Sequence, residues 1–104
     1  MLRFKRGDSV EWPAKYKVNG LVVDLTNYNV ASQVRTKDGV LVCAFTIVKL
    51  DQTILPGQYL LKLTALDTAG LRPGSYFQDI QYSLAGDVRS TTTTPLVIDA
   101  DQTQ

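Results

Sequence analysis

The side chains that could carry out catalysis are few in this chain of 104 residues, and their spacing matches no known catalytic arrangement. There is no histidine, which removes the commonest general base and a common metal ligand. Neither the single Cys43 nor any serine has a base partner suggested by the sequence, so nucleophilic catalysis has no candidate. A carboxylate pair for glycoside hydrolysis would require Glu11 and an aspartate to meet in space, and nothing in their spacing favours this. The sequence therefore predicts a protein that is not an enzyme.

Metal and cofactor binding have equally little support in the sequence. Asp99 and Asp101, together with Asp87, offer oxygen ligands for a weak Ca²⁺ site. Carboxylates in turns and tails serve more often to keep a protein soluble, which is the interpretation favoured here. The chain has no glycine-rich loop of the kind that holds a phosphate group. We therefore expect no cofactor and no bound metal.

Aromatic side chains are the remaining candidates for a binding site. The chain has one tryptophan, Trp12, and five tyrosines, which could form a stacking platform for sugars. Most of these aromatic residues fall on the inward face of a predicted strand, and this register places them in the core. A carbohydrate-binding module for a host-surface glycan is therefore the alternative function rather than the first choice.

Length, charge and cysteine content limit the class of protein further. A chain of this size forms one domain with a modest core. The net charge of +1 is too small to indicate nucleic acid or a membrane as a partner. The lone Cys43 excludes an intramolecular disulfide. The first residues do not resemble a signal peptide, and no apolar run approaches the ~20 residues of a transmembrane helix. We expect synthesis in a reducing cytoplasm.

Alternation of apolar and polar residues predicts β-strands along most of the chain. Residues 9–18 alternate most clearly, with an inward face made of Val10, Trp12, Ala14, Tyr16 and Val18. Residues 76–84 have the pattern of a half-buried antiparallel strand. Residues 40–50 are apolar on both faces, which predicts a central strand covered on two sides.

Turn residues separate these predicted strands. The Asn-Gly pair at 19–20 is typical of a type I′ hairpin, and the Asp-Gly pair at 38–39 indicates a second hairpin. Pro-Gly pairs at 56–57 and 73–74 suit type II turns, in which proline fixes φ and glycine accepts a positive φ. Residues 85–87 predict another tight turn. Residues 67–71 predict one helical turn with Asp67 as the N-cap.

Short strands at regular spacing with turns between them indicate an all-β fold. The prediction is an immunoglobulin-like antiparallel β-sandwich of seven to eight short strands. Residues 1–98 form the single β-sandwich domain, and residues 99–104 form a polar C-terminal tail.

Several short sequence motifs resemble those of a family of small immunoglobulin-like structural proteins of phages and prophages, akin to the N-terminal domain of phage baseplate upper proteins. The similar segments occur in the same order in chain and family, and they are residues 6–9 with Trp12, residues 20–28, 33–35, 71–82 and 86–91. The chain departs from the family pattern at Asn27, where glycine is usual, and at Arg72, where proline is usual. Asparagine tolerates the left-handed conformation that a glycine would adopt there.

The resemblance implies a non-catalytic virion structural protein, assembled in the host cytoplasm. It would act in a tail, a baseplate, a head–tail adaptor or a decoration through protein–protein contacts. The implied partners are other virion proteins and further copies of the chain in a symmetric assembly, with no nucleic acid and no membrane. The segments that lie outside the strongest core pattern are the expected partner contacts, namely Leu2, Arg3, Phe4, Lys5, Arg6, Asp99 and Asp101.

Overall fold

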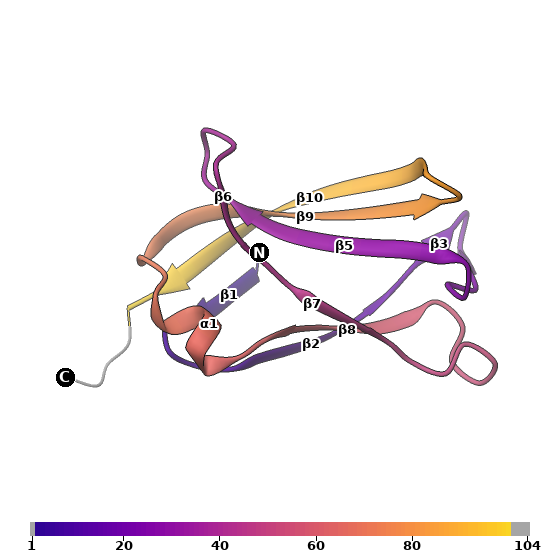
Figure 1. Ribbon diagram of the computed structural model, residues 1–104, viewed down its shortest axis with the longest axis horizontal. Coiled ribbons are helices and arrows are strands. Elements are labelled where there is room, and N and C mark those ends of the chain that lie inside the picture. The colour runs from indigo at the N-terminus through magenta and orange to yellow at the C-terminus, as the bar shows by residue number, and fades with distance from the viewer. Residues whose placement is uncertain (1, 101–104) are drawn as a thin grey trace.

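Ten strands and one short helix make up a small, mostly-β domain in residues 2–100, the part of the chain described by the computed structural model (Figure 1). The largest sheet has five strands in the order β1-β10-β9-β5-β6, a second sheet has the order β2-β8-β7, and β3 and β4 form a separate hairpin. The strands are β1 (Leu2–Lys5), β2 (Val10–Lys15), β3 (Lys17–Val18), β4 (Leu21–Val22), β5 (Tyr28–Arg35), β6 (Leu41–Ala44), β7 (Thr46–Lys49), β8 (Gln58–Leu63), β9 (Gly74–Leu84) and β10 (Asp87–Asp99).

The all-β prediction is confirmed as far as a mostly-β domain with one short helix, but two details of it are wrong. The described residues contain more than seven or eight strands, and the last two strands are long, with 11 and 13 residues. The five-stranded sheet is also mixed rather than antiparallel, because β1 runs parallel to β10, whereas the β2-β8-β7 sheet is antiparallel as predicted. Alternation along a strand shows which side chains point inward, but it does not show the direction of the neighbouring strand.

The inward face predicted for residues 9–18 is correct up to Tyr16. Val10 and Tyr16 are buried, and Trp12 and Ala14 are partly buried against the core. The Trp12 ring lies between two other rings, with centroids 6.0 Å from Phe4 and 5.8 Å from Phe45. Val18 is 45% exposed because it belongs to the β3–β4 hairpin, outside both larger sheets.

We expect Trp12→Ala to lower the free energy of unfolding by about 3 kcal/mol, because a cavity would form between the rings of Phe4 and Phe45. Glu11→Ala is the matched control, since the neighbouring Glu11 side chain is exposed and forms an exposed ion pair with Lys62. Denaturant melts of both variants measure the difference. A loss below about 1 kcal/mol for the tryptophan variant would contradict the inward register of β2.

The predicted central strand over residues 40–50 is wrong. This run is split at the buried Phe45 into β6 and β7, and each half forms an edge of a different sheet. The Phe45 backbone N–H still bonds to the Ser32 carbonyl of β5 at 2.9 Å, and β7 then pairs with β8. A strand that crosses between sheets has the same continuous apolar run as a strand covered on two sides, so the pattern alone could not distinguish them.

The helical turn begins earlier than the sequence predicted. The helix α1 (Ala65–Ala69) has Thr64 as its N-cap, and the Thr64 side chain accepts a hydrogen bond from the Asp67 N–H at 3.0 Å. The Asp67 carboxylate accepts in turn from the Thr64 N–H at 2.8 Å. Asp67 is therefore the third residue of a capping box and not the cap itself.

Most predicted turns are present, with one exception. Asn19 and Gly20 both have positive φ, as a type I′ hairpin requires. Gly57 has φ of 80°, and the Gln58 N–H bonds to the Leu55 carbonyl at 3.2 Å, which fits the type II turn. Gly74 instead has φ of 152° and is the first residue of β9, so the predicted type II turn at 73–74 is wrong.

The turn between β9 and β10 contains a residue that is poorly suited to its conformation. Ala85 has φ of 53° and Gly86 has φ of 86°, the two positive values of a type I′ turn. Ala85→Asn is expected to raise the free energy of unfolding by about 1 kcal/mol, because asparagine tolerates this region better than alanine. Asn19→Ala is the reciprocal control at φ of 52° and should destabilise by a similar amount. Thermal melts of the pair check both signs, and equal stability of Ala85→Asn and the parent would refute the argument.

A cluster of tyrosines in the core joins the two larger sheets, with Tyr59 on β8 and Tyr82 on β9. The Tyr16 and Tyr82 rings stack with centroids 3.8 Å apart and an interplanar angle of 12°. The hydroxyl groups of Tyr59 and Tyr82 share a hydrogen bond. Burial raises the pKa of both Tyr59 and Tyr82, so the two phenols stay neutral at physiological pH.

The buried Gln78, the polar exception in its strand, donates to the Ser32 hydroxyl at 3.1 Å.

Candidate functional site

The predicted N-terminal contact segment is an edge strand of the five-stranded sheet. In β1, the side chain of Phe4 is buried and Leu2 packs against the core, while Arg3 and Lys5 point to solvent. The residue pairs Leu2–Leu96 and Phe4–Ile98 fix the register with β10. The prediction that this segment lies outside the core is therefore wrong for Phe4, and only its alternate residues can reach a partner.

Arg3, Arg6 and Asp99 are brought together where β1 ends beside β10. Arg3 Nε lies 3.1 Å from Asp99 Oδ2, and the Arg6 N–H donates to the Asp99 carbonyl at 2.9 Å. Asp99 is the last residue of β10 and belongs to the sheet rather than to a tail. Asp101 and the other residues after 100 lie outside the described part of the chain.

Both edges of the five-stranded sheet are occupied by short strands. β1 and β6 have four residues each, and within residues 2–100 each pairs with only one neighbour. The outer sides of these strands therefore carry backbone groups that another strand can pair with. β1 carries the charged Arg3 and Lys5, whereas β6 carries no charged residue.

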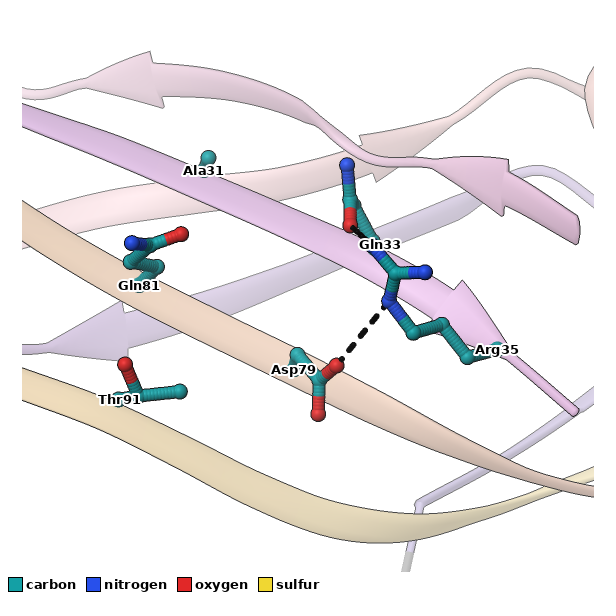
Figure 2. Close-up of a pocket in the computed structure, with 6 residues that line it drawn as sticks. All are labelled: Ala31, Gln33, Arg35, Asp79, Gln81 and Thr91. Carbon is teal, nitrogen blue, oxygen red and sulfur yellow. Dashed lines mark hydrogen bonds and ion pairs between the residues drawn. The ribbon is translucent and has the colours of Figure 1, made fainter. Parts of the chain in front are cut away.

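A shallow depression lies on the outer face of the same sheet, over β5, β9 and β10 (Figure 2). Its volume is about 120 Å³, below the 300 Å³ or more of a typical small-molecule site, and its lining residues are Ala31, Gln33, Arg35, Asp79, Gln81 and Thr91. Arg35 Nε lies 3.4 Å from Asp79 Oδ2, and Arg35 also donates to Gln33 Oε1. Thr93 Oγ1 donates to Asp79 Oδ1 at 2.9 Å. The charges are thus already paired with each other.

The side chains considered as metal ligands or catalytic groups do not come together in the fold. Among residues 2–100, no three histidine, cysteine, aspartate or glutamate side chains lie close enough together to hold a metal ion. Asp87 and Asp99 stand at opposite ends of β10, so they cannot share a Ca²⁺ ion. Glu11 Oε1 is paired with Lys62 Nζ at 3.2 Å. Cys43 is partly buried, and this burial raises the pKa of its thiol, which favours the less reactive protonated form.

Aromatic rings do not form an exposed platform in the described part of the chain. Tyr16, Tyr59 and Tyr82 are buried. Trp12, Tyr28 and Tyr76 are partly buried and pack against the same core.

The described residues contain no helix that is long and apolar enough to span a membrane.

Gln52 is a structurally important residue that the sequence analysis missed. Its Oε1 accepts hydrogen bonds from the Leu25 N–H at 3.0 Å and the Gly57 N–H at 2.8 Å. Its Nε2 donates to the carbonyls of Leu50 at 2.8 Å and Gln58 at 3.0 Å. One side chain thus fixes the loop between β7 and β8 and joins it to residue 25. A single glutamine in a predicted connector carries no sequence pattern that would reveal this role.

Comparison with known proteins does not assign the chain to a family. No protein-family model matches it, and no curated protein is significantly similar to it. The fold defines the class of the chain as a small, mostly-β domain with mixed sheets.

Proposed function

We propose that this chain is a non-catalytic structural protein of a phage virion, working in a tail, baseplate, head–tail adaptor or decoration through protein–protein contacts. The colinear sequence motifs that resemble the phage family support this assignment. Several motif residues have structural roles in the fold: Leu25, Leu71 and Gln78 are buried. The motifs therefore describe the scaffold, and the exposed surfaces are left to bind partners.

We also propose that the two larger sheets form an immunoglobulin-like sandwich. In that fold, strands G, F and C are neighbours in one sheet and B, E and D in the other. The orders β10-β9-β5 and β2-β8-β7 fit these places, with β6 beside β5 as an added C′ strand. An experimental structure with the sheets face to face about 10 Å apart would support the sandwich, and a sheet closing into a barrel would contradict it.

The observation that carries the functional proposal is the open edge on each side of one five-stranded sheet. β1 of one copy can pair with β6 of the next, because both strands have four residues and free outer edges. Such a contact joins two different patches and so generates a ring or a filament rather than a closed dimer. This geometry suits a part that is repeated around a symmetry axis of a virion. Other virion proteins would bind the remaining surfaces.

A charge placed on β6 tests this contact. Leu41 is 51% exposed, so its replacement should leave the fold intact. Leu41→Lys would bring a cation toward Arg3 and Lys5 of the next copy and should prevent strand pairing. Leu41→Asp is the control for lost apolar area, and it should be tolerated better because its charge is opposite. The measurement is the amount of each variant in particles from the strain that encodes the chain, determined by mass spectrometry, with a thermal melt to confirm folding.

Three outcomes bear on the proposal. Loss of Leu41→Lys from particles that still contain the parent chain supports it. Absence of the parent chain from all particles overturns the virion assignment. Binding of the parent chain to a host glycan on an array, with no copies in particles, favours the carbohydrate-binding alternative.

A further inference from the structure

Three loops at one end of the molecule, with the strand residues next to them, carry six of the ten large apolar side chains that are exposed in the described part of the chain. The loops are the β3–β4 hairpin, the connection between β7 and β8, and the β9–β10 turn, and they share one end of the 45 Å long axis (Figure 1). Leu21 and Ile54 are 73% and 72% exposed. The full set, called the apolar tip below, comprises Val18, Leu21, Val22, Ile54, Leu55 and Val88.

Hydrogen bonds hold two of the three loops in place, namely the β7–β8 connection and the β3–β4 hairpin. Gln52 bonds to four backbone groups in and around the β7–β8 connection. The Tyr16 N–H donates to the Gly57 carbonyl at 2.8 Å, and the Val23 N–H donates to the Tyr16 carbonyl at 3.1 Å, which joins this connection to the β3–β4 hairpin. Preorganised apolar groups lose little conformational entropy on binding. Exposed apolar side chains on loops held in this way can therefore bind a partner at a low cost in conformational entropy.

We propose that the apolar tip docks into a concave apolar pocket on a different protein of the same assembly. This inference rests on the proposed structural function and adds the chemistry of one partner. Val88 lies eight residues along β10 from Leu96, the partner of Leu2, so the tip and the β1 edge are separated by about 27 Å of extended strand. The chain is thus an adaptor that contacts a neighbour at its sheet edge and a second protein at its tip.

The shape and size of the apolar tip favour a concave partner over a second copy. Three protruding loops are convex, and a two-fold contact between copies requires a surface that is complementary to itself. Two convex surfaces touch over a small area, whereas a stable interface buries ~800 Å² per partner. Insertion into a pocket covers the same loops from several sides and buries more of each side chain.

The residue types at the apolar tip also favour a protein over a membrane. The exposed side chains are valine, leucine and isoleucine, with none of the aromatic residues that anchor proteins at a membrane interface. Lys17 and Arg89 flank the tip, but so do Asp24, Asp51 and Asp87. This mixed charge gives little attraction to an anionic lipid surface and is compatible with a polar rim around an apolar pocket.

Photo-cross-linking in assembled particles tests the inference. The probe is benzoylphenylalanine at position 54, and the control carries it at position 66, because Leu66 is an 86% exposed apolar residue on α1, away from the tip. We expect the position-54 probe to join the chain to one other polypeptide, through a peptide rich in apolar residues, and the position-66 probe not to join that polypeptide. The double variant Leu21→Ser/Ile54→Ser should reduce occupancy in particles at least about tenfold, whereas Leu66→Ser should not.

The opposing results are distinct from one another. A cross-linked product of two copies of the chain would show self-association at the tip. Flotation of the parent chain, but not of the double variant, with phosphatidylglycerol vesicles would show a membrane contact. Full occupancy of the folded double variant would overturn the tip as a docking surface while leaving the proposed function intact. Absence of the parent chain from particles would overturn the proposed function and this inference together.

Discussion

Replacing Gly57 with alanine is expected to lower the free energy of unfolding by at least about 3 kcal/mol, the largest effect of any glycine-to-alanine change in this chain. Gly57 has φ of 80°, which costs an alanine about 1–2 kcal/mol. An added Cβ would also lie 2.8 Å from the Tyr16 carbonyl oxygen and 3.2 Å from the Val23 carbonyl oxygen. Both contacts are with backbone atoms, which cannot move aside without disturbing β2 and the β3–β4 hairpin.

Gly20→Ala separates the two contributions. Gly20 has nearly the same φ, 81°, but an added Cβ there would meet nothing within 4 Å. This control should cost only the conformational part, about 1–2 kcal/mol. Denaturant melts of the two variants give the cost of the close approach as their difference. Equal losses for Gly20→Ala and Gly57→Ala would mean that the backbone around Gly57 yields easily.

The contrast between these glycines shows which part of the fold the sequence could predict. The turn at residues 56–57 and the hairpin at 19–20 were both predicted, because local φ requirements select proline, asparagine and glycine. The packing of the Gly57 backbone against Tyr16 and Val23 depends on segments 41 and 34 residues away in the chain. No local pattern encodes that approach, so the sequence could not indicate which glycine matters more.

The same distinction explains the errors in the strand assignments. Inward positions from Val10 to Tyr16 were predicted correctly, since burial on one face imposes a period of two: Val10 and Tyr16 are buried, and Trp12 and Ala14 are partly buried. The crossing at Phe45 and the parallel pairing of β1 with β10 were not predicted. These features are decided by which strands become neighbours, a long-range property that alternation does not report.

The candidate contact surfaces were predicted only in part. The N-terminal segment was predicted to be accessible because it lies outside the strongest core pattern, and Arg3 and Lys5 are exposed. The burial of Phe4 was missed because four residues are too few to establish a pattern. The apolar tip was missed because its six residues come from three separate parts of the sequence, and each looked like part of a strand or a connector.

The second large effect is expected at Gln52, where Gln52→Ala should lower the free energy of unfolding by about 3 kcal/mol. The variant would remove four hydrogen bonds to backbone groups. The N–H groups of Leu25 and Gly57 would lose the acceptor that they share, and an unpaired buried donor costs about 1–3 kcal/mol. Gln81→Ala is the matched control, because Gln81 is an exposed glutamine on the outer face of β9, and it should change stability by less than about 0.5 kcal/mol.

Gln52→Glu shows whether hydrogen-bond donation matters as well as acceptance. A glutamate keeps the two acceptor contacts to Leu25 and Gly57, but at neutral pH its carboxylate would face the carbonyls of Leu50 and Gln58, to which Gln52 Nε2 now donates. We therefore expect Gln52→Glu to be no more stable than Gln52→Ala. Stability close to that of the parent would mean that the donated bonds contribute nothing. The Gln52 side chain also fixes the loop that carries Ile54 and Leu55. We therefore expect the folded Gln52→Ala protein to be present in particles at lower occupancy than the parent, because a loosened loop must be ordered again when it binds.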